Sequence, residues 1–227
     1  MKLFITVTAA VFLSTPVVAG QPSNLLTQRV NNAIAVQLTH NPAATDKYGT
    51  PHMIKWARQG DIQSLRQAAA YAKDGNFLNI RDSYGNNLFH VAKNADTVQA
   101  IASLIRQFYG EKTSKQIATL VNQRNRADET PLHAQINAAH ADTFRPLYRY
   151  SLLKQRNEEA RKQLARLQGN PTLMAQHKAI YCADIYKLAS AQGRTLLQAA
   201  KDQIPYNPEM ILLSQSIERR IPCLAQH

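Results

Sequence analysis

Apolar residues recur at helical spacing along much of this chain. Near the N-terminus they stand four residues apart, at Leu26, Val30, Ile34 and Leu38, and Ser23 can cap the first turn. No stretch alternates apolar and polar positions with β-branched residues, and the chain has only 8 glycines for the tight turns of a hairpin-rich protein. The pattern therefore predicts an all-α fold with a helix near the start of the chain.

A second helical pattern advances in alternating steps of three and four residues, at Tyr150, Leu153, Asn157, Ala160, Leu164 and Leu167. Glu158 and Glu159 can pair with Lys162 on its surface, and Gly169-Asn170-Pro171 ends it. The seam covers fewer than three heptads, which is too short to indicate an intermolecular coiled coil. We therefore expect this helix to pack against the rest of the chain, with Asn157 at the edge of the packing.

Residues 1–19 have the pattern of a secretory signal peptide, with a positive start, an apolar run and small residues before the cleavage point. We predict cleavage after Ala19, with Gly20 as the alternative. An uncleaved anchor is disfavoured because the apolar run is short and Pro16 interrupts it, and the later apolar segment 210–213 is far too short to span a bilayer. We therefore expect an exported protein without an integral membrane span.

One short motif in the middle of the chain returns in weaker form upstream. Thr130-Pro131-Leu132-His133 matches the first four letters of T-P-L-H-x-A, and Asn87-Leu88-Phe89-His90-Val91-Ala92 is the weaker copy. The segment from Trp56 to Leu65 places Gly60 at a turn between two helices, where a left-handed residue is wanted. These segments resemble the ankyrin-repeat family, whose repeats are stacked helix pairs that bind other proteins.

The spacing of the copies is irregular. The position equivalent to His90 is Ile54, 36 residues earlier, and His133 follows 43 residues later, whereas the family period is about 33. The longer gap needs an insertion of about ten residues, which 108–114 can supply as an extended second helix and loop. A fourth, degenerate copy at 193–200, with a second helix from Pro208, is left open.

The resemblance implies an all-α, short ankyrin-like solenoid of three to four divergent helix-turn-helix repeats. In this interpretation residues 20–50 form an N-terminal helix and loop, and residues 51–150 form the repeats. Residues 151–227 form a helical cap with the degenerate copy.

The resemblance also implies that a concave face, made of the hairpin tips and the first helix of each repeat, binds a protein partner. Carried onto this sequence, the tip positions are Arg81, Ser83, Tyr84, Arg124, Asn125 and Arg126, and the exposed first-helix positions are Lys55, Arg58, Asn94 and Asn137. Their arginines favour a partner with an acidic surface. His90 and His133 fall on the histidine of the family motif, which bonds backbone and neighbouring-repeat groups, so we expect a structural role for both.

The two cysteines, Cys182 and Cys223, both fall in the last quarter of the chain. In an oxidising compartment such a pair favours a disulfide, and two buried free thiols are the alternative. Such a disulfide would link a helix of the cap covalently to the end of the chain.

The formal charge of +12 is unevenly spread, because the stretch from Arg145 to Lys178 holds eight basic residues against Glu158 and Glu159. Such a stretch can contact anionic envelope components or simply form a solvated face. Nucleic acid is the least favoured partner because the protein is expected to act outside the cytoplasm.

We expect no catalytic residue, cofactor or metal. No Cys or carboxylate completes a metal cluster around the histidines, and Gly110-Glu111-Lys112-Thr113 fails the phosphate-loop pattern. The sequence therefore favours a non-enzymatic protein-binding module of the bacterial periplasm, a scaffold or accessory subunit of an envelope assembly such as a secretion apparatus. The alternatives are a secreted protein that binds host targets and an enzyme in the C-terminal region.

Overall fold

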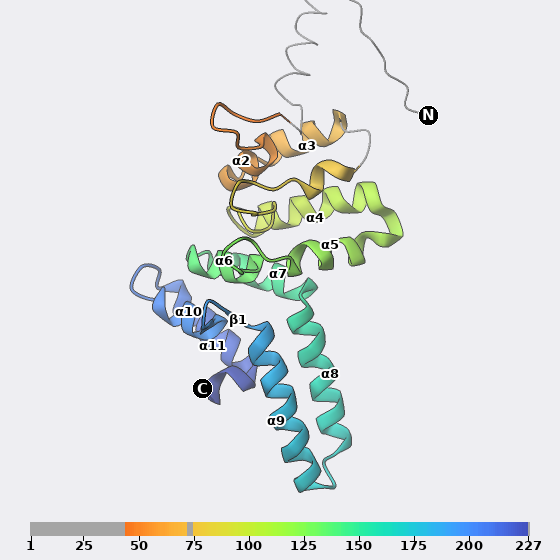
Figure 1. Cartoon of the computed structure of the whole chain (residues 1–227), viewed down its shortest axis with the longest axis vertical. Coiled ribbons are helices and arrows are strands. Elements are labelled where there is room, and N and C mark those ends of the chain that lie inside the picture. Colours follow the sequence, from red (N-terminus) through yellow and green to blue (C-terminus); the bar gives the residue numbers. More distant parts are fainter. Residues whose placement is uncertain (1–43, 72–74, 227) are drawn as a thin grey trace, which may run out of the picture. The chain divides into compact units, whose positions relative to one another are not determined.

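The computed structural model describes residues 44–71 and 75–226 (Figure 1). These residues fold mostly into helices, with one short pair of strands, so the expected all-α class is confirmed. The signal peptide expected at 1–19 and the helix expected at 26–38 lie outside the described residues. No described helix combines the length and the apolar character that crossing a membrane requires.

The first helix pair is α2 (His52–Gln59) and α3 (Ile62–Tyr71). Gly60 joins them with φ of 75°, in the left-handed region, and its N–H donates back to the carbonyls of Ala57 and Trp56. Gly60 therefore occupies the turn that the sequence predicts for it.

The second unit departs from a simple helix pair. After η1 (Gly75–Asn79), the segment around His90 forms turns, and the first long helix is α4 (Ala95–Tyr109). The Asn87 side-chain oxygen accepts the N–H groups of Phe89 and His90 at 3.0 and 3.3 Å, and Asn94 caps α4 by accepting the Thr97 N–H at 3.0 Å. These local bonds hold turns where the motif copy predicts a first helix.

The extra residues between the motif copies at His90 and His133 form a separate helix. The chain leaves α4 through Gly110, whose φ is 50°, passes η2 (Gly110–Lys112) and enters α5 (Thr113–Asn122). The expected extended helix therefore ends at Tyr109, and the added length is used for α5, which packs on α4 and α7.

The third unit consists of α6 (Pro131–Asn137), η3 (Ala141–Thr143) and α7 (Phe144–Tyr150). Buried Gln135 joins it to the second unit, since its amide donates to the carbonyls of Phe89 and His90 at 3.1 and 2.8 Å.

Two long helices, α8 (Leu152–Arg166) and α9 (Pro171–Leu188), form an antiparallel hairpin that extends away from the stacked units (Figure 1). We call α8 and α9 together the arm. Near its base Leu153, Asn157 and Ala160 are buried, whereas Leu164 and Leu167 are only half-buried. The helix expected at 150–167 therefore packs mainly on α9, and only its first turns pack on the stacked units.

The chain returns to the stack through the strand pair β1 (Ser190–Ala191) and β2 (Arg194–Thr195), followed by α10 (Leu196–Asp202), α11 (Glu209–Arg220) and η4 (Pro222–Gln226). Thr195 and Gln198 form a capping box at the start of α10. Because α10 packs on both α6 and α11, the last helix pair continues the stack, and a single apolar core extends from Met53 to Leu224.

Candidate protein-binding surface

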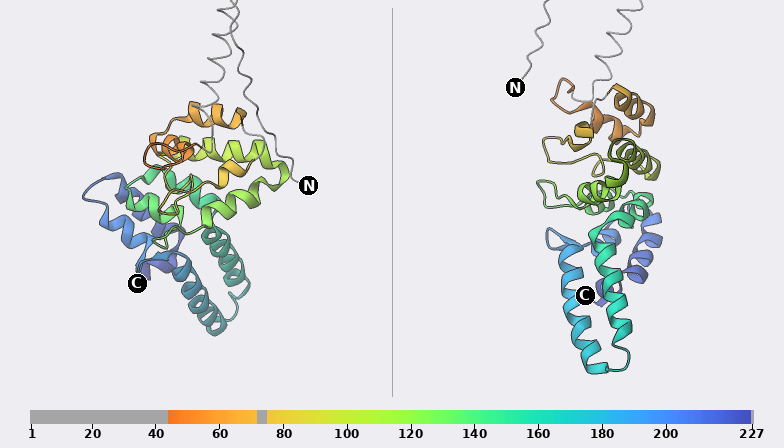
Figure 2. Two further views of the ribbon diagram at one scale, coloured as in Figure 1. Left: turned by 45° about the horizontal axis from the view of Figure 1, so that its top comes forward. Right: turned by 90° about the vertical axis from the view of Figure 1, so that its right-hand side faces the viewer.

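Four loops lie along one edge of the stacked units, as the right-hand view of Figure 2 shows. They span residues 46–50, 82–86, 125–129 and 190–195, each directly before a helix or the turns that replace it. We call them the first to fourth tips.

The first two tips are built in the same way, 36 residues apart. Asp46 Oδ1 accepts the N–H groups of Tyr48 and Thr50, both at 2.9 Å. Asp82 Oδ1 likewise accepts those of Tyr84 and Asn86, at 3.0 and 2.9 Å. This equivalence was not predicted, because residues 20–50 were expected to form an N-terminal helix and loop, although the repeated D-x-Y-G pattern signals it.

The third tip uses an amide in place of the carboxylate. Asn125 Oδ1 accepts the N–H groups of Ala127 and Glu129 at 2.9 and 3.0 Å, and Asp128 adopts φ of 60° where the first two tips have glycine. Asparagine and aspartate are among the few residues that adopt this region without a large penalty.

Hydrogen bonds join the second, third and fourth tips into a row. The Arg126 N–H donates to the Tyr84 carbonyl at 2.9 Å, and the Gln192 amide donates to the Ala127 carbonyl at 3.0 Å. The Arg81 guanidinium lies 3.5 Å from the Arg124 carbonyl. These bonds order the row internally, so little backbone entropy is left to lose on binding.

Several residues expected to contact a partner serve the fold. Arg124 binds Asp128 and reaches the Ser190 carbonyl at 3.4 Å, and Arg58 pairs with Asp82 at 3.2 Å. Asn94 caps α4, Asn137 donates to Glu129 at 2.6 Å, and Asn125 organises its own tip.

Six of the ten expected residues are exposed: Lys55, Arg58, Arg81, Ser83, Tyr84 and Arg126. The Tyr84 side chain is 70 % exposed, and its counterpart on the first tip, Tyr48, is 78 % exposed. Tyr48 is not among the residues expected to contact a partner, because it lies in the segment 20–50 that was expected to precede the repeats. Two aromatic side chains thus stand at equivalent positions on neighbouring tips.

A hollow of about 450 Å³ lies beside the second and third tips. It is lined by Tyr84, Asn86, His90, Asn125, Arg126, Ala127, Glu129 and Ala134. Arg126 and Glu129 give it one charge of each sign, and Asn86 and Asn125 add amides. The hollow, which we call the tip groove, can therefore accept a polar segment that offers both donors and acceptors.

The two motif histidines are buried beneath the tips. His90 Nε2 donates to the Glu129 carbonyl at 3.0 Å, and Nδ1 accepts the Asn87 N–H at 3.2 Å. His133 Nδ1 lies 2.8 Å from the Thr130 hydroxyl. Burial lowers the pKa of each histidine to about 4. The backbone carbonyl of Glu129 raises the pKa of His90, and that of Ala189 raises the pKa of His133, but both effects are smaller than that of burial. Both rings are therefore neutral at pH 7; His90 joins the second unit to the third tip, and His133 contacts the residue that precedes its own helix.

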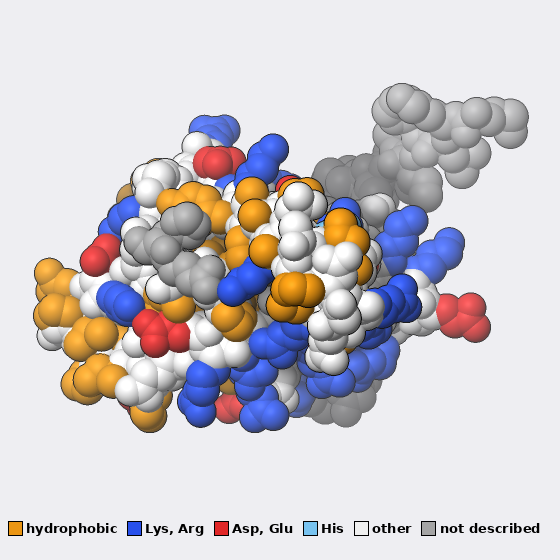
Figure 3. Space-filling view, turned by 90° about the horizontal axis from the view of Figure 1, so that it is seen from below, with side chains coloured by type: hydrophobic (Ala, Val, Ile, Leu, Met, Phe, Trp, Pro, Cys, Tyr) orange, Lys and Arg blue, Asp and Glu red, His pale blue; other side chains and the backbone are white. Residues whose placement is uncertain are grey.

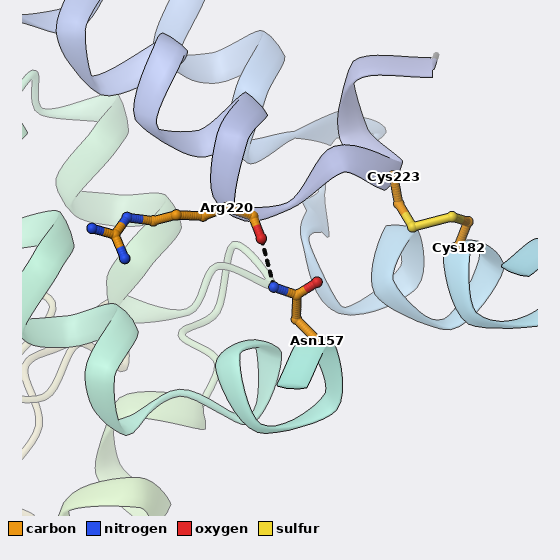
Figure 4. The surroundings of a disulfide bond; sticks show 4 residues. All are labelled: Asn157, Cys182, Arg220 and Cys223. Atoms are coloured by element: carbon orange, nitrogen blue, oxygen red, sulfur yellow. Dashed lines mark hydrogen bonds between the residues drawn. A yellow bond between two sulfur atoms is a disulfide. The ribbon is translucent and has the colours of Figure 1, made fainter. Parts of the chain in front are cut away.

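The expected disulfide is present, with an S–S distance of 2.03 Å between Cys182 on α9 and Cys223 on η4 (Figure 4). Beside it, Asn157 of α8 points at the end of α11. The bridge and this contact attach both helices of the arm to the C-terminal segment.

Within the part of the chain that the structure describes, no three His, Cys, Asp or Glu side chains gather closely enough to hold a metal ion. The tip surface offers aromatic rings, amides and isolated charges, which suit recognition of another molecule.

No protein-family model and no curated protein sequence matches this chain.

Proposed function

We propose that this chain is a divergent ankyrin-repeat protein whose tips and tip groove bind a protein partner. The repeated tip geometry supports the family assignment, together with the Thr130–His133 contact and the packing of α10 on α6. In that family such surfaces recognise proteins and perform no chemistry of their own.

The observation that carries the binding proposal is the exposure of Tyr48 and Tyr84 on two tips whose backbones are held by the side chains of Asp46 and Asp82. Tyrosine supplies a large amphipathic contact area at a low entropic cost, and it is enriched at binding hot spots. Because each of these two tips is internally bonded, both rings are presented without a further ordering step.

An acidic region on the partner is favoured near Arg126 and Lys55, both of which are exposed. Arg81 and Arg124 contribute less to recognition in this proposal, since their guanidinium groups bind tip carbonyls. Glu129 contributes less as well, since its carboxylate already accepts the side-chain amides of Asn137 and Asn125 at 2.6 and 3.2 Å.

The periplasm is the proposed location. A disulfide and the absence of a membrane-crossing helix among the described residues are compatible with it. Fractionation of the source cells distinguishes periplasmic retention from release into the medium, the secreted alternative.

The test is affinity capture from the native cell envelope with the tagged full chain. We expect the Tyr84→Ala/Arg126→Ala pair to lose its specific partner. The matched control, Tyr206→Ala/Arg66→Ala, removes one exposed tyrosine and one exposed arginine elsewhere and should capture normally. Equal capture by both double variants would disprove the tip-groove assignment.

A further inference from the structure

A second hollow, of about 440 Å³, lies between α4 and α7. We call it the α4–α7 cleft. One face of α4 supplies Val98, Gln99, Ala102, Ser103 and Arg106, and α7 supplies Arg145, Pro146, Arg149 and Tyr150. None of these residues lines the tip groove, so the cleft is a separate feature.

Three arginines and no carboxylate line the cleft. Among the described residues, no ion pair involves Arg106, Arg145 or Arg149, whereas Arg58, Arg124, Arg156 and Arg194 are each paired with an acid. Arg149 lies over the Tyr150 ring, with its guanidinium carbon 5.9 Å from the ring centre. The cleft therefore concentrates unneutralised positive charge.

The nearby acids do not compensate this charge. Asp142, three residues before Arg145, accepts the Ala95 N–H at 2.7 Å and so caps the start of α4. Asp96 stands in the first turn of α4, ten residues before Arg106, which is about 15 Å along a helix. On the face of the molecule seen from below in Figure 3, Lys and Arg side chains cover more of the surface than Asp and Glu side chains do.

The cleft has the size and the lining of a small-ligand site. Its volume falls within the range of about 300–1,000 Å³ typical of ligand pockets. Val98 and Ala102 are buried and form an apolar floor, while Gln99 and Ser103 are exposed beside the arginines. Planar guanidinium groups bind phosphate through paired hydrogen bonds, which a lysine ammonium does not provide.

We infer that the α4–α7 cleft binds a phosphate-bearing group, held by Arg106, Arg145 and Arg149. A phosphate concentrates negative charge at one point and can meet three arginines at once. Carboxylates of an acidic peptide are spread along an extended backbone and suit a compact cleft less well. The source is either an anionic lipid headgroup or a soluble phosphate compound, and both present the same chemistry to the cleft.

The test uses the full chain and two probes. Calorimetry with inorganic pyrophosphate reports soluble phosphate, and sedimentation with phosphatidylglycerol vesicles, compared with phosphatidylcholine vesicles, reports the headgroup. We expect Arg106→Gln/Arg145→Gln/Arg149→Gln to weaken binding of at least one probe about tenfold or more. Loss with vesicles identifies a lipid source, and loss with pyrophosphate alone identifies a soluble one.

A matched control removes the same charge elsewhere, through Arg66→Gln/Lys115→Gln/Lys178→Gln on three exposed positions. It should bind within about twofold of the parent, since distant surface charges are largely screened. Arg106→Lys/Arg145→Lys/Arg149→Lys keeps the charge but loses the forked guanidinium donors, and it should bind with intermediate affinity.

Three results would overturn the inference. The first is binding of neither probe by the parent chain. The second is equal weakening in the cleft and control triples, which would reflect net charge alone. The third is binding of hexaglutamate as tight as that of pyrophosphate with the same dependence on the three arginines, which would assign the cleft to carboxylates.

Discussion

The side-chain amide of Asn157, in the middle of α8, donates a 2.6 Å hydrogen bond to the backbone carbonyl of Arg220 at the end of α11 (Figure 4). The last carbonyls of a helix have no partner within it. Arg161, also on α8, donates to the same carbonyl at 2.9 Å and places a positive charge at the negative end of the α11 dipole. The base of the arm thereby caps the last helix of the stack.

Replacing Asn157 with alanine should therefore destabilise the fold. The change removes the bond to Arg220 and leaves the buried Tyr148 hydroxyl without its 3.2 Å partner. We expect a loss of about 1–3 kcal/mol in the free energy of unfolding, measured by urea denaturation. Gln155→Ala, on an exposed position of the same helix, should change it by less than about 0.5 kcal/mol. Equal losses in the two variants would contradict the capping role.

The disulfide should stabilise the fold mainly by restricting the unfolded chain. Cys182 and Cys223 are separated by 41 residues, and closing such a loop contributes about 4 kcal/mol on the chain-entropy model. We expect Cys182→Ser/Cys223→Ser to lower the Tm by about 10 °C in thermal unfolding followed by circular dichroism. Reductant should lower the Tm of the parent by a similar amount and leave that of the double variant unchanged. A parent chain insensitive to reductant would refute this prediction.

The spacing of apolar residues predicted those helices that bury one face, such as the helix at 150–167. The partner of that helix could not be predicted. On α9 the apolar residues Leu173 and Ile180 are 42 % and 62 % exposed, so its sequence shows no clear apolar face. The turns at 88–91 were also missed, because side-chain bonds from Asn87 outweigh the helical tendency of the motif copy.

The candidate site was predictable in part. The motif placed the second and third tips, and with them Tyr84 and Arg126. The first tip was not predicted because Met53 and Ile54 follow it, at the positions where the motif at 130–133 has leucine and histidine. The α4–α7 cleft was not predicted for a different reason. Its three arginines lie on helices far apart in the sequence, and only the packing of α7 on α4 brings them together.

Asp82 should be important for the stability of the second tip. Its side chain accepts two backbone N–H groups and the Asn86 amide, and it pairs with Arg58 while only 4 % exposed. We expect Asp82→Ala to lower the free energy of unfolding by about 1–3 kcal/mol. Asp82→Asn should lose less, since an amide oxygen still accepts the backbone bonds, as Asn125 does in the third tip. Urea denaturation measures the free energy of unfolding of both variants. A larger loss for Asp82→Asn than for Asp82→Ala would contradict the role of this side chain as the acceptor that holds the second tip.

Acid should destabilise the fold through His90 and His133. Their folded-state pKa of about 4 lies below the usual 6.5, so the unfolded chain binds more protons once the pH falls below about 6.5. The stabilisation is complete above that pH and is lost progressively as the pH falls toward 4. We expect each histidine to remove about 1–2 kcal/mol between pH 7 and pH 5, measured by urea denaturation at both values.

His133→Gln tests the assignment of this loss to a particular ring. In α10, Gln198 follows Thr195 by three residues, as His133 follows Thr130. Its side chain accepts the Thr195 N–H at 2.9 Å, so glutamine is compatible with the local structure at this position. The variant should lose less stability than the parent between pH 7 and pH 5, and adding His90→Gln should reduce the loss further. If the parent and the double variant lose the same free energy over this interval, groups other than the motif histidines control the acid sensitivity.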